Sequence, residues 1–321
     1  MCTAISSKGK KHFFGRNLDF EHSFGELFLI TPRNFPMSFR HAEPINTHFA
    51  LLGMGIVQDS FPLYFDAVNE KGLCVAGLLF TGFAHYHNID KTRTNLAPFE
   101  IIPWILAQCA CAKEAKALLQ GINIVDTHFS SEYPNTPLHW IISDKNESIV
   151  LESIAEGVFI YDNPPCVLTN SPPFPLQLFN LNNFMGLSPY PPENTFSPEL
   201  KLSTYSRGMG SIGLPGDFSS SSRFVRAAFL NSHADTEDNP ELFSDILKNL
   251  SPLPGSVLNE KNEKETTIYS SCIDSEKGIY YCKTFGSTTP YAVDMHTHNL
   301  NSDTLLTFRL PSATFSYNLL H

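Results

Sequence analysis

The residue with the strongest claim to chemistry is Cys2. If the initiator Met1 is removed, Cys2 becomes the first residue and carries both a thiol and a free α-amine. An α-amine has an ordinary pKa of about 7.7–8.0, which suits a general base at neutral pH. A thiol needs such a base, or a neighbouring cation, before it acts as a nucleophile. Cys2 could therefore supply nucleophile and base together, although a cysteine at position 2 is by itself a weak signal.

A short hairpin is predicted next to Cys2. Residues 3–6 and 12–16 have strand character and flank a short polar turn. Pairing of these strands would bring Arg16 and Asp19 toward the N-terminus. An arginine there would favour the thiolate form of the cysteine, and an aspartate would hold or orient the α-amine. The plainer interpretation of the two residues is a surface ion pair.

Residues 208–213 match the GxGxxG pattern of dinucleotide-binding loops. That function needs a strand before the loop and a helix that opens inside it. Pro215 follows the last glycine closely and prevents a helix from starting where the pyrophosphate would sit. The segment is therefore predicted to be a flexible glycine-rich loop, and we expect no cofactor.

Two pairs of histidines could each place two imidazoles on one face of a strand, His85 with His87 and His296 with His298. A zinc site needs three or four ligands, and no cysteine or carboxylate pattern completes either pair. We therefore expect surface histidines and no metal.

The seven cysteines are an odd number, which argues against a disulfide framework. Cys109 and Cys111 fall on one predicted helix, where side chains two residues apart diverge. They are expected to be core thiols rather than metal ligands. No GxSxG motif for a serine nucleophile occurs, so Cys2 remains the candidate nucleophile.

The elements that must position these residues are strands near both ends of the chain with helices between them. Residues 73–80 form an apolar run typical of a strand covered on both faces. Helices are predicted over residues 99–109, 113–120, 219–231 and 240–250. Residues 185–217 are rich in Pro, Gly and Ser and are predicted to be a long irregular excursion. No linker divides the chain, so we expect one layered α+β domain over residues 1–321.

Composition excludes several classes of partner. Hydrophobic residues make up 42% of the chain, which is enough for a large core. The net charge of −10 would repel phosphate backbones, so we expect no nucleic acid partner. No apolar run is long enough to span a membrane, and the N-terminus lacks the apolar core of a signal peptide. The expected location is therefore cytoplasmic.

Nine short motifs follow one another along the chain, at residues 1–5, 14–19, 30–34, 69–73, 76–78, 137–140, 167–170, 213–217 and 222–226. Their collinear combination resembles the choloylglycine hydrolase family of N-terminal nucleophile hydrolases, which includes bile salt hydrolases and penicillin V acylases. The resemblance covers essentially the whole chain. It implies a four-layer αββα sandwich, in agreement with the expected α+β class.

The resemblance also implies roles for individual residues. Cys2 corresponds to the nucleophile, with its α-amine as the base, and Arg16 and Asp19 correspond to the pair beside it. Asn170 corresponds to the residue whose side-chain amide stabilises the oxyanion, and Arg223 to a second active-site arginine. Fixed neutral or cationic donors are what a tetrahedral oxyanion needs.

Leu79 departs from the family pattern. Bile salt hydrolases usually carry asparagine at this position, and penicillin V acylases tend toward tyrosine. The backbone N–H of Leu79 can still donate to an oxyanion, because any residue except proline supplies one. A side-chain contact to the substrate is lost, so the departure bears on specificity and rate rather than on the chemistry.

On this resemblance, the expected reaction is hydrolysis of glycine- or taurine-conjugated bile salts through a thioester on Cys2. The alternatives are a penicillin V acylase or another N-acyl amide hydrolase, and a non-catalytic bile-salt-binding relative. A steroid acyl group requires an apolar cleft with few polar anchors. Five apolar residues on segments expected to be loops either line that cleft or belong to the core: Leu18, Phe24, Phe61, Phe65 and Phe129. The resemblance further implies a homotetramer.

Overall fold

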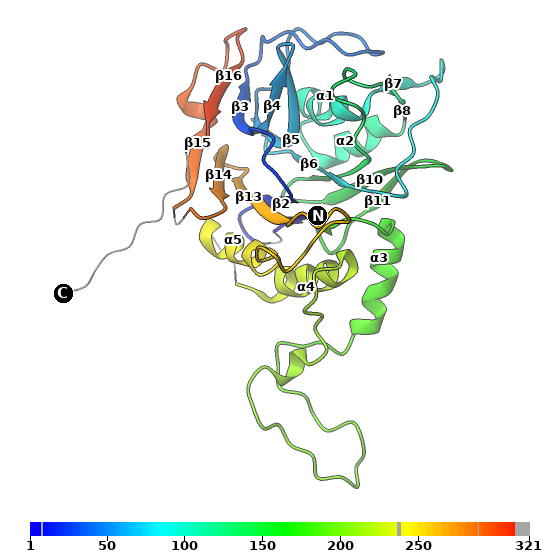
Figure 1. Ribbon diagram of the computed structural model, residues 1–321, viewed down its shortest axis with the longest axis vertical. Coiled ribbons are helices and arrows are strands. Elements are labelled where there is room, and N and C mark those ends of the chain that lie inside the picture. Colours follow the sequence, from blue (N-terminus) through cyan, green and yellow to red (C-terminus); the bar gives the residue numbers. More distant parts are fainter. Residues whose placement is uncertain (8, 236–238, 288, 312–321) are drawn as a thin grey trace, which may run out of the picture.

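The computed structural model describes residues 1–7, 9–235, 239–287 and 289–311. Two antiparallel sheets form the centre of the molecule (Figure 1). The first has six strands in the order β12 (Val167–Leu168), β1 (Cys2–Ser6), β2 (Phe13–Phe20), β13 (Thr266–Asp274), β14 (Ile279–Thr284) and β15 (Tyr291–Asp294). The second has eight, in the order β11 (Gly157–Asp162), β10 (Ser148–Ile154), β9 (Leu138–Ser143), β6 (Cys74–Leu79), β5 (Phe61–Asn69), β4 (Leu51–Gln58), β3 (Leu27–Thr31) and β16 (Leu306–Arg309).

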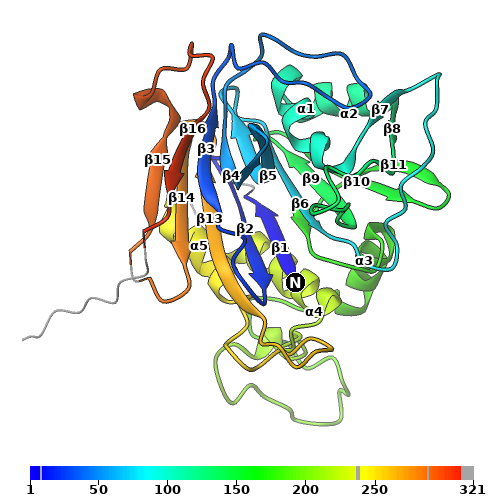
Figure 2. The same cartoon turned by 45° about the horizontal axis from the view of Figure 1, so that its top comes forward.

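Helices cover the outer faces of both sheets (Figure 2). The eight-stranded sheet is covered by α1 (Ile101–Gln108) and α2 (Ala112–Leu119), and the six-stranded sheet by α4 (Ser220–His233) and α5 (Pro240–Lys248). The structure also has α3 (Phe174–Asn180) beside α4, and a parallel pair of β7 (Thr94–Leu96) with β8 (Ile122–Ile124). The layers run helix, sheet, sheet, helix, so the predicted four-layer αββα architecture is confirmed.

The predicted hairpin at the N-terminus is β1 with β2. Cys2 lies opposite Leu18 and Ala4 lies opposite Arg16. Because side chains alternate between the faces of a strand, these four residues share one face of the sheet, the face toward the second sheet. Asp19 is three residues from Arg16 and points to the other face. The register therefore places the arginine, but not the aspartate, on the same side as the Cys2 thiol.

Close packing in the centre of the first sheet depends on a glycine. A Cβ on Gly15 would stand 2.1 Å from the backbone oxygen of Ser271 in the neighbouring strand β13. The apolar run at residues 73–80 likewise forms the predicted doubly covered strand, β6, whose residues from Cys74 to Leu78 are buried. β6 also contacts β1, so the two sheets meet beside the N-terminus.

Two local predictions were wrong. Three residues expected on loops lie on strands. Leu18 lies on β2, which continues past the predicted end of the strand because it pairs with β13. Phe61 and Phe65 lie on β5, where the turn at Asp59 and Ser60 and the following proline obscured the alternating pattern. Cys109 and Cys111 do not share a helix. They are the terminal caps of α1 and α2, where both residues adopt extended backbone between the helices.

The excursion at residues 185–217 is an irregular arm that projects from the body below α3 and α4 (Figure 1). The GxGxxG pattern lies in this arm. Its middle residues form a single 3-10 turn, Met209–Ser211, and residues 201–205 before it form no strand. The prediction of a glycine-rich loop, rather than a dinucleotide-binding motif, is confirmed.

Candidate active site

The Cys2 thiol is buried at the start of β1, with only 2% of the residue exposed. Its nearest polar neighbour is Arg16, whose Nη2 donates to Sγ at 2.8 Å. The two residues reach each other because the hairpin register puts them on one face of the sheet. A cation at hydrogen-bond distance favours the thiolate, the reactive form of cysteine.

Backbone carbonyls of the second sheet hold Arg16 in place. Its Nη1 donates to the oxygens of Gly77 at 2.6 Å and Phe65 at 3.2 Å. Burial opposes the charge of this guanidinium, but the surrounding groups, Cys2 first among them, outweigh burial and raise the pKa of Arg16. The guanidinium is therefore a fixed positive charge aimed at the thiol.

Asn170 and Arg223 meet on the other side of Cys2. The Oδ1 atom of Asn170 accepts from the backbone nitrogen of Cys2 at 2.9 Å and from Arg223 Nη2 at 2.7 Å. Its Nδ2 donates to the backbone oxygen of Leu79 at 2.8 Å. Oδ1 accepts from two donors and Nδ2 donates to a carbonyl oxygen, so these contacts define the orientation of the Asn170 amide. One Nδ2 hydrogen remains beyond this bond, because an amide nitrogen carries two.

Arg223 extends this cluster from α4. Its Nη1 donates to the backbone oxygen of Cys2 and to Thr3 Oγ1, at 2.6 Å from the latter. The helix that carries it has Ser219 as its N-cap, at the residue where the helix over 219–231 was predicted to begin. The structure thus brings Cys2, Arg16, Asn170 and Arg223 together.

Asp19 faces the helix side of the six-stranded sheet. Its Oδ1 accepts from Thr267 Oγ1 at 2.6 Å, and no described residue bonds the buried Oδ2. Burial raises the pKa of this carboxyl, against the electrostatic effect of Arg223. Asp19 therefore does not form the surface ion pair that was the plainer expectation.

Met1 continues the strand pairing beyond Cys2. Its terminal nitrogen donates to the backbone oxygen of Asp19 at 2.8 Å and to Glu265 Oε2 at 3.0 Å. In return, the Asp19 nitrogen donates to the Met1 oxygen at 3.0 Å. While Met1 is attached, the Cys2 nitrogen is a peptide nitrogen and cannot accept a proton. Its bond to Asn170 nevertheless marks the position that a free α-amine would occupy.

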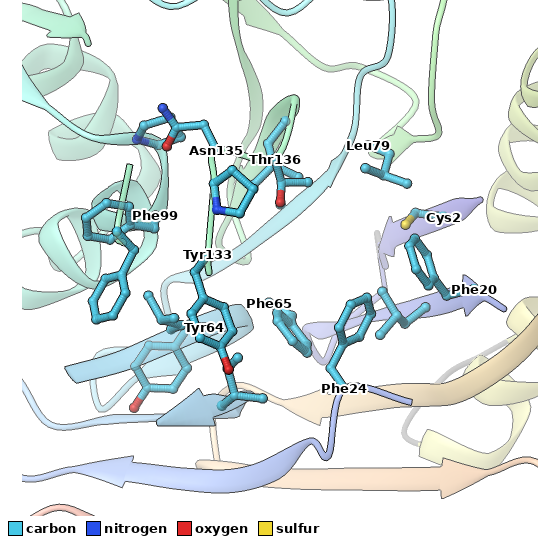
Figure 3. Close-up of a pocket in the computed structure, with 18 of the residues that line it drawn as sticks. Cys2, Phe20, Phe24, Tyr64, Phe65, Leu79, Phe99, Tyr133, Asn135 and Thr136 are labelled. Atoms are coloured by element: carbon cyan, nitrogen blue, oxygen red, sulfur yellow. The ribbon is translucent and has the colours of Figure 1, made fainter. Parts of the chain in front are cut away.

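An apolar cavity of about 280 Å³ leads away from the thiol. Figure 3 shows Cys2 and Leu79 at one end and Phe99 toward the other, with Phe20, Phe24, Phe65 and Tyr133 between or around them. The lining is mainly aromatic and aliphatic, with few polar side chains. Such a site suits a ligand with a large apolar group and a reactive bond at one end.

Four of the five predicted cleft residues line this cavity, namely Leu18, Phe24, Phe65 and Phe129. Phe61 does not line it. Its ring packs behind the wall, with its centroid 6.2 Å from that of Phe129. Sequence reasoning missed much of the remaining lining: Phe20, Ile56, Leu63, Tyr64, Pro98, Phe99, Tyr133, Pro134, Asn135, Thr136 and Leu138.

Arg40 braces the wall of the cavity at the end opposite Cys2, a role that no sequence pattern predicted. The Arg40 guanidinium lies 5.3 Å from the centroid of the Phe129 ring and 6.0 Å from that of Phe99. Its Nη2 also donates to the Phe129 backbone oxygen at 2.9 Å. Gln58 Nε2 donates to Tyr133 Oη at 2.6 Å. These long-range contacts hold a loop that carries no recognisable motif.

Four of the six other cysteines are buried, whereas Cys166 and Cys111, which was expected to be a core thiol, are only partly buried. Burial raises the pKa of the Cys109 thiol to about 12. It also raises the pKa values of Cys74, Cys272 and Cys282. These thiols are therefore held in the unreactive protonated form. Within the described ranges, no three His, Cys, Asp or Glu side chains gather as a metal site. No helix in the described part of the chain has the length and apolar character to cross a bilayer.

Comparisons with known proteins agree with this geometry. The family model for linear amide C–N hydrolases of the choloylglycine hydrolase family matches residues 2–308. The chain is 46% identical to a bile salt hydrolase/transferase of Lactiplantibacillus plantarum, over 99% of each chain.

Solved structures share the architecture. A mutant conjugated bile acid hydrolase from Clostridium perfringens matches with a TM-score of 0.92 at 36% identity, over 100% of both chains. A penicillin V acylase from Agrobacterium tumefaciens has a TM-score of 0.76 at 20% identity, covering 95% of this chain and 90% of its own, and so shares the fold. The chain belongs to the choloylglycine hydrolase family of linear amide C–N hydrolases.

Proposed function

We propose that this protein hydrolyses the amide bond of glycine- or taurine-conjugated bile salts, with Cys2 as the nucleophile. The observation that carries the proposal is the position of Cys2, whose thiol lies beside Arg16 at one end of a large apolar cavity. The relative that is 46% identical is named as a bile salt hydrolase/transferase. A steroid acyl group would fill the cavity and present its amide carbonyl to the thiol.

Removal of Met1 is the first step of the proposed mechanism. The freed α-amine of Cys2 takes the thiol proton, and Sγ attacks the amide carbonyl. Asn170 holds the amine through Oδ1, and its spare Nδ2 hydrogen and the Leu79 N–H donate to the oxyanion. Collapse of the tetrahedral intermediate breaks the C–N bond, and the proton passes to the departing glycine or taurine.

Water completes the reaction. The α-amine accepts a proton from a water molecule, whose oxygen attacks the thioester carbonyl. Sγ then leaves and regains a proton, and the free bile acid is released. Arg16 favours the thiolate at each stage, and the buried Asp19 lies beside the N-terminal segment on the opposite face.

Replacement of the nucleophile tests this proposal. We expect Cys2→Ala to lower kcat by on the order of 10⁶-fold, as in other nucleophile deletions, while bile salt binding remains. Cys272→Ala, which removes another buried thiol, should leave kcat unchanged. Amino acid release from glycocholate and taurocholate, compared with turnover of penicillin V, gives the measurement. Rapid penicillin V turnover without bile salt turnover would overturn the substrate assignment.

The same assay decides between the alternatives. A penicillin V acylase would turn over penicillin V preferentially, and the penicillin V acylase compared above supports the fold only. A non-catalytic relative would bind bile salts with no turnover that depends on Cys2. Neither alternative is favoured by the relatives that match over nearly the whole chain.

Acyl transfer is a second candidate activity, because relatives at 46% and 38% identity carry "transferase" in their names. An amine nitrogen would attack the thioester in place of water, and Sγ would leave as before. Incubation of a conjugated bile salt with a different amino acid should then yield the exchanged conjugate, detected by mass. Absence of that product at millimolar amine would limit the activity to hydrolysis.

The proposal includes a homotetramer, which rests on the family resemblance, and the arm at residues 185–217 offers a surface for association between subunits. Several large apolar side chains on it are exposed, among them Met185, Phe196 and Tyr205 at more than four-fifths of their surface. Such side chains are commonly buried against another subunit. Light scattering should give four times the chain mass of 35.9 kDa, and the double variant Phe196→Ser with Tyr205→Ser should reduce the measured mass.

We also propose a cytoplasmic location, which would be tested by assaying the activity in cell fractions.

A further inference from the structure

We propose that the buried pair of His139 and Glu152 is a positioning device for the two segments that present the oxyanion donors. The inference rests on the proposed function, because it concerns the same reaction. Neither residue touches the cavity or Cys2, and both are fully buried. They act through Asn170 and Leu79.

One side of the pair fixes the strand that leads into Asn170. His139 Nε2 lies 2.8 Å from the backbone oxygen of Thr169, the residue immediately before Asn170. Because a carbonyl oxygen only accepts, Nε2 must carry a hydrogen. The imidazole of His139 therefore fixes the position of the peptide group between Thr169 and Asn170.

The other side fixes the chain after Asn170. Glu152 Oε1 accepts from the backbone nitrogen of Phe174 at 2.9 Å, and Phe174 is the first residue of α3. The same oxygen lies 3.0 Å from His139 Nδ1, within hydrogen-bond distance. The pair thus holds the chain on both sides of the turn that contains Asn170.

The imidazole also contacts the segment of the second donor. The ring of Phe80 stacks on that of His139, with centroids 4.3 Å apart and an interplanar angle of 7°. Phe80 follows Leu79 directly, and its nitrogen donates to the Pro137 oxygen at 2.9 Å. Asn170 Nδ2 then joins the two segments by its bond to the Leu79 oxygen. One side chain therefore supports both proposed donors.

A purely packing role does not require ionisable groups here. Burying a titratable pair is costly, and apolar side chains of similar volume often pack as well or better. An apolar pair could not supply the directional bonds to Thr169 and Phe174.

Other contacts also hold Asn170 and limit the loss of kcat expected when His139 is replaced. Ser220 Oγ accepts from the Asn170 backbone nitrogen at 2.9 Å, and Gln177 Nε2 donates to the Asn170 backbone oxygen at 3.3 Å.

Two conservative variants separate positioning from packing. In His139→Gln the amide nitrogen replaces Nε2 and can still donate to Thr169, whereas in His139→Asn the shorter side chain reaches only toward Glu152. We expect His139→Asn to lower kcat for glycocholate about 10–100-fold, the cost of misplacing a reacting geometry by about 1 Å, with KM changed less than twofold. His139→Gln should recover most of this loss.

The matched control is His12→Gln. His12 is also a buried histidine, and its two ring nitrogens lie within hydrogen-bond distance of the hydroxyls of Ser6 and Ser275, away from Asn170. It should lose stability but keep the kcat of the wild type per folded molecule, with the folded fraction taken from thermal unfolding. Equal kcat for His139→Asn, His139→Gln and the wild type would overturn the inference.

The two hypotheses fail in different ways. If the folded wild-type protein turns over no conjugated bile salt, the proposed function fails. If the wild type is active and the histidine variants lose only folded protein or only substrate affinity, the positioning role alone fails. If neither His139 variant folds, Glu152→Gln takes their place, because Oε1 of Glu152 makes both contacts and a glutamine amide can bond either the Phe174 nitrogen or His139 Nδ1 but not both. We expect a lower kcat per folded molecule with KM changed less than twofold, and an unchanged kcat would contradict the positioning role.

Discussion

At the Cys2 end of the cavity, Arg16 comes from a strand and Arg223 from a helix, whereas at the opposite end Phe129 and Tyr133 come from the loop between β8 and β9. The first end is densely hydrogen-bonded and buried. The second is formed by aromatic rings in edge contact, held by a few side chains such as Arg40.

This difference matches two physical demands. A reacting thiol and its oxyanion donors must be held to within a fraction of an ångström, which hydrogen-bonded sheets and helices achieve. Recognition of an apolar acyl group depends mainly on buried area and tolerates small displacements of the rings. Changes at the Cys2 end should therefore alter kcat, and changes at the aromatic end should alter KM.

After removal of the thiol itself, the largest expected effect at the Cys2 end follows from blocking the Cys2 amine. A fusion that retains residues before Cys2 should lower kcat about 10²–10⁴-fold, because a peptide nitrogen cannot act as a general base. Proteolysis that leaves Cys2 first should restore activity. Intact mass with activity on the same samples gives the measurement. Equal kcat in both forms would exclude the α-amine as base.

Asn170→Ala tests the donor side of the same end. Loss of one oxyanion donor typically lowers kcat about 10²–10³-fold, and KM should change little. Asn231→Ala is the matched control, since its Nδ2 also donates to two buried backbone oxygens, those of Ser6 and Pro165. The control should cost stability and retain kcat. A parallel loss in both variants would point to folding rather than to chemistry.

His12 provides a way to separate folding from chemistry when pH is varied. Burial lowers the pKa of His12 from 6.5 to about 4, against the opposing effects of Asp144 and Asp274. The unfolded chain then binds more protons than the folded one between these values, so stability falls as the pH drops from 6.5 toward 4. The expected loss is about 3 kcal/mol at 1.36 kcal/mol per pKa unit.

Urea unfolding at pH 4.5 and pH 7 measures this contribution. The free energy of unfolding should change less with pH in His12→Gln than in the wild type. If the free energy of unfolding changes with pH equally in both proteins, groups other than His12 cause the loss of stability in acid. The dependence of kcat on pH would then need a separate correction for unfolded protein.

The smallest effect is expected at the aromatic end. Phe129→Ala should raise KM for conjugated bile salts about tenfold, since burial of a large apolar side chain contributes about 1.5–3 kcal/mol. kcat should change less than threefold. Phe159→Ala removes a partly exposed ring on β11 that does not line the cavity, and should leave both constants unchanged. A fall in kcat with constant KM for Phe129→Ala would break the division between the two ends.

Local sequence was sufficient to predict much of the Cys2 end. The β1–β2 hairpin follows from strand pattern and a short turn, and its register alone brings Arg16 to the thiol over 14 residues of chain. The apolar run of β6 and the serine-capped helix α4 were equally recognisable. By contrast, Asn170 and Arg223 were placed only by the family resemblance, because their contacts to Cys2 span 168 and 221 residues.

The sequence by itself predicted the candidate nucleophile, the hairpin that carries it and the layered α+β class, and each of these predictions depends on residue chemistry or on short-range periodicity. The four-layer αββα sandwich followed from the family resemblance. Only the tertiary structure decided that Phe61 lies behind the cavity wall and that loop residues around Tyr133 line the cavity. Those positions result from packing between distant segments, and no local pattern in the chain specifies which distant segment each will meet.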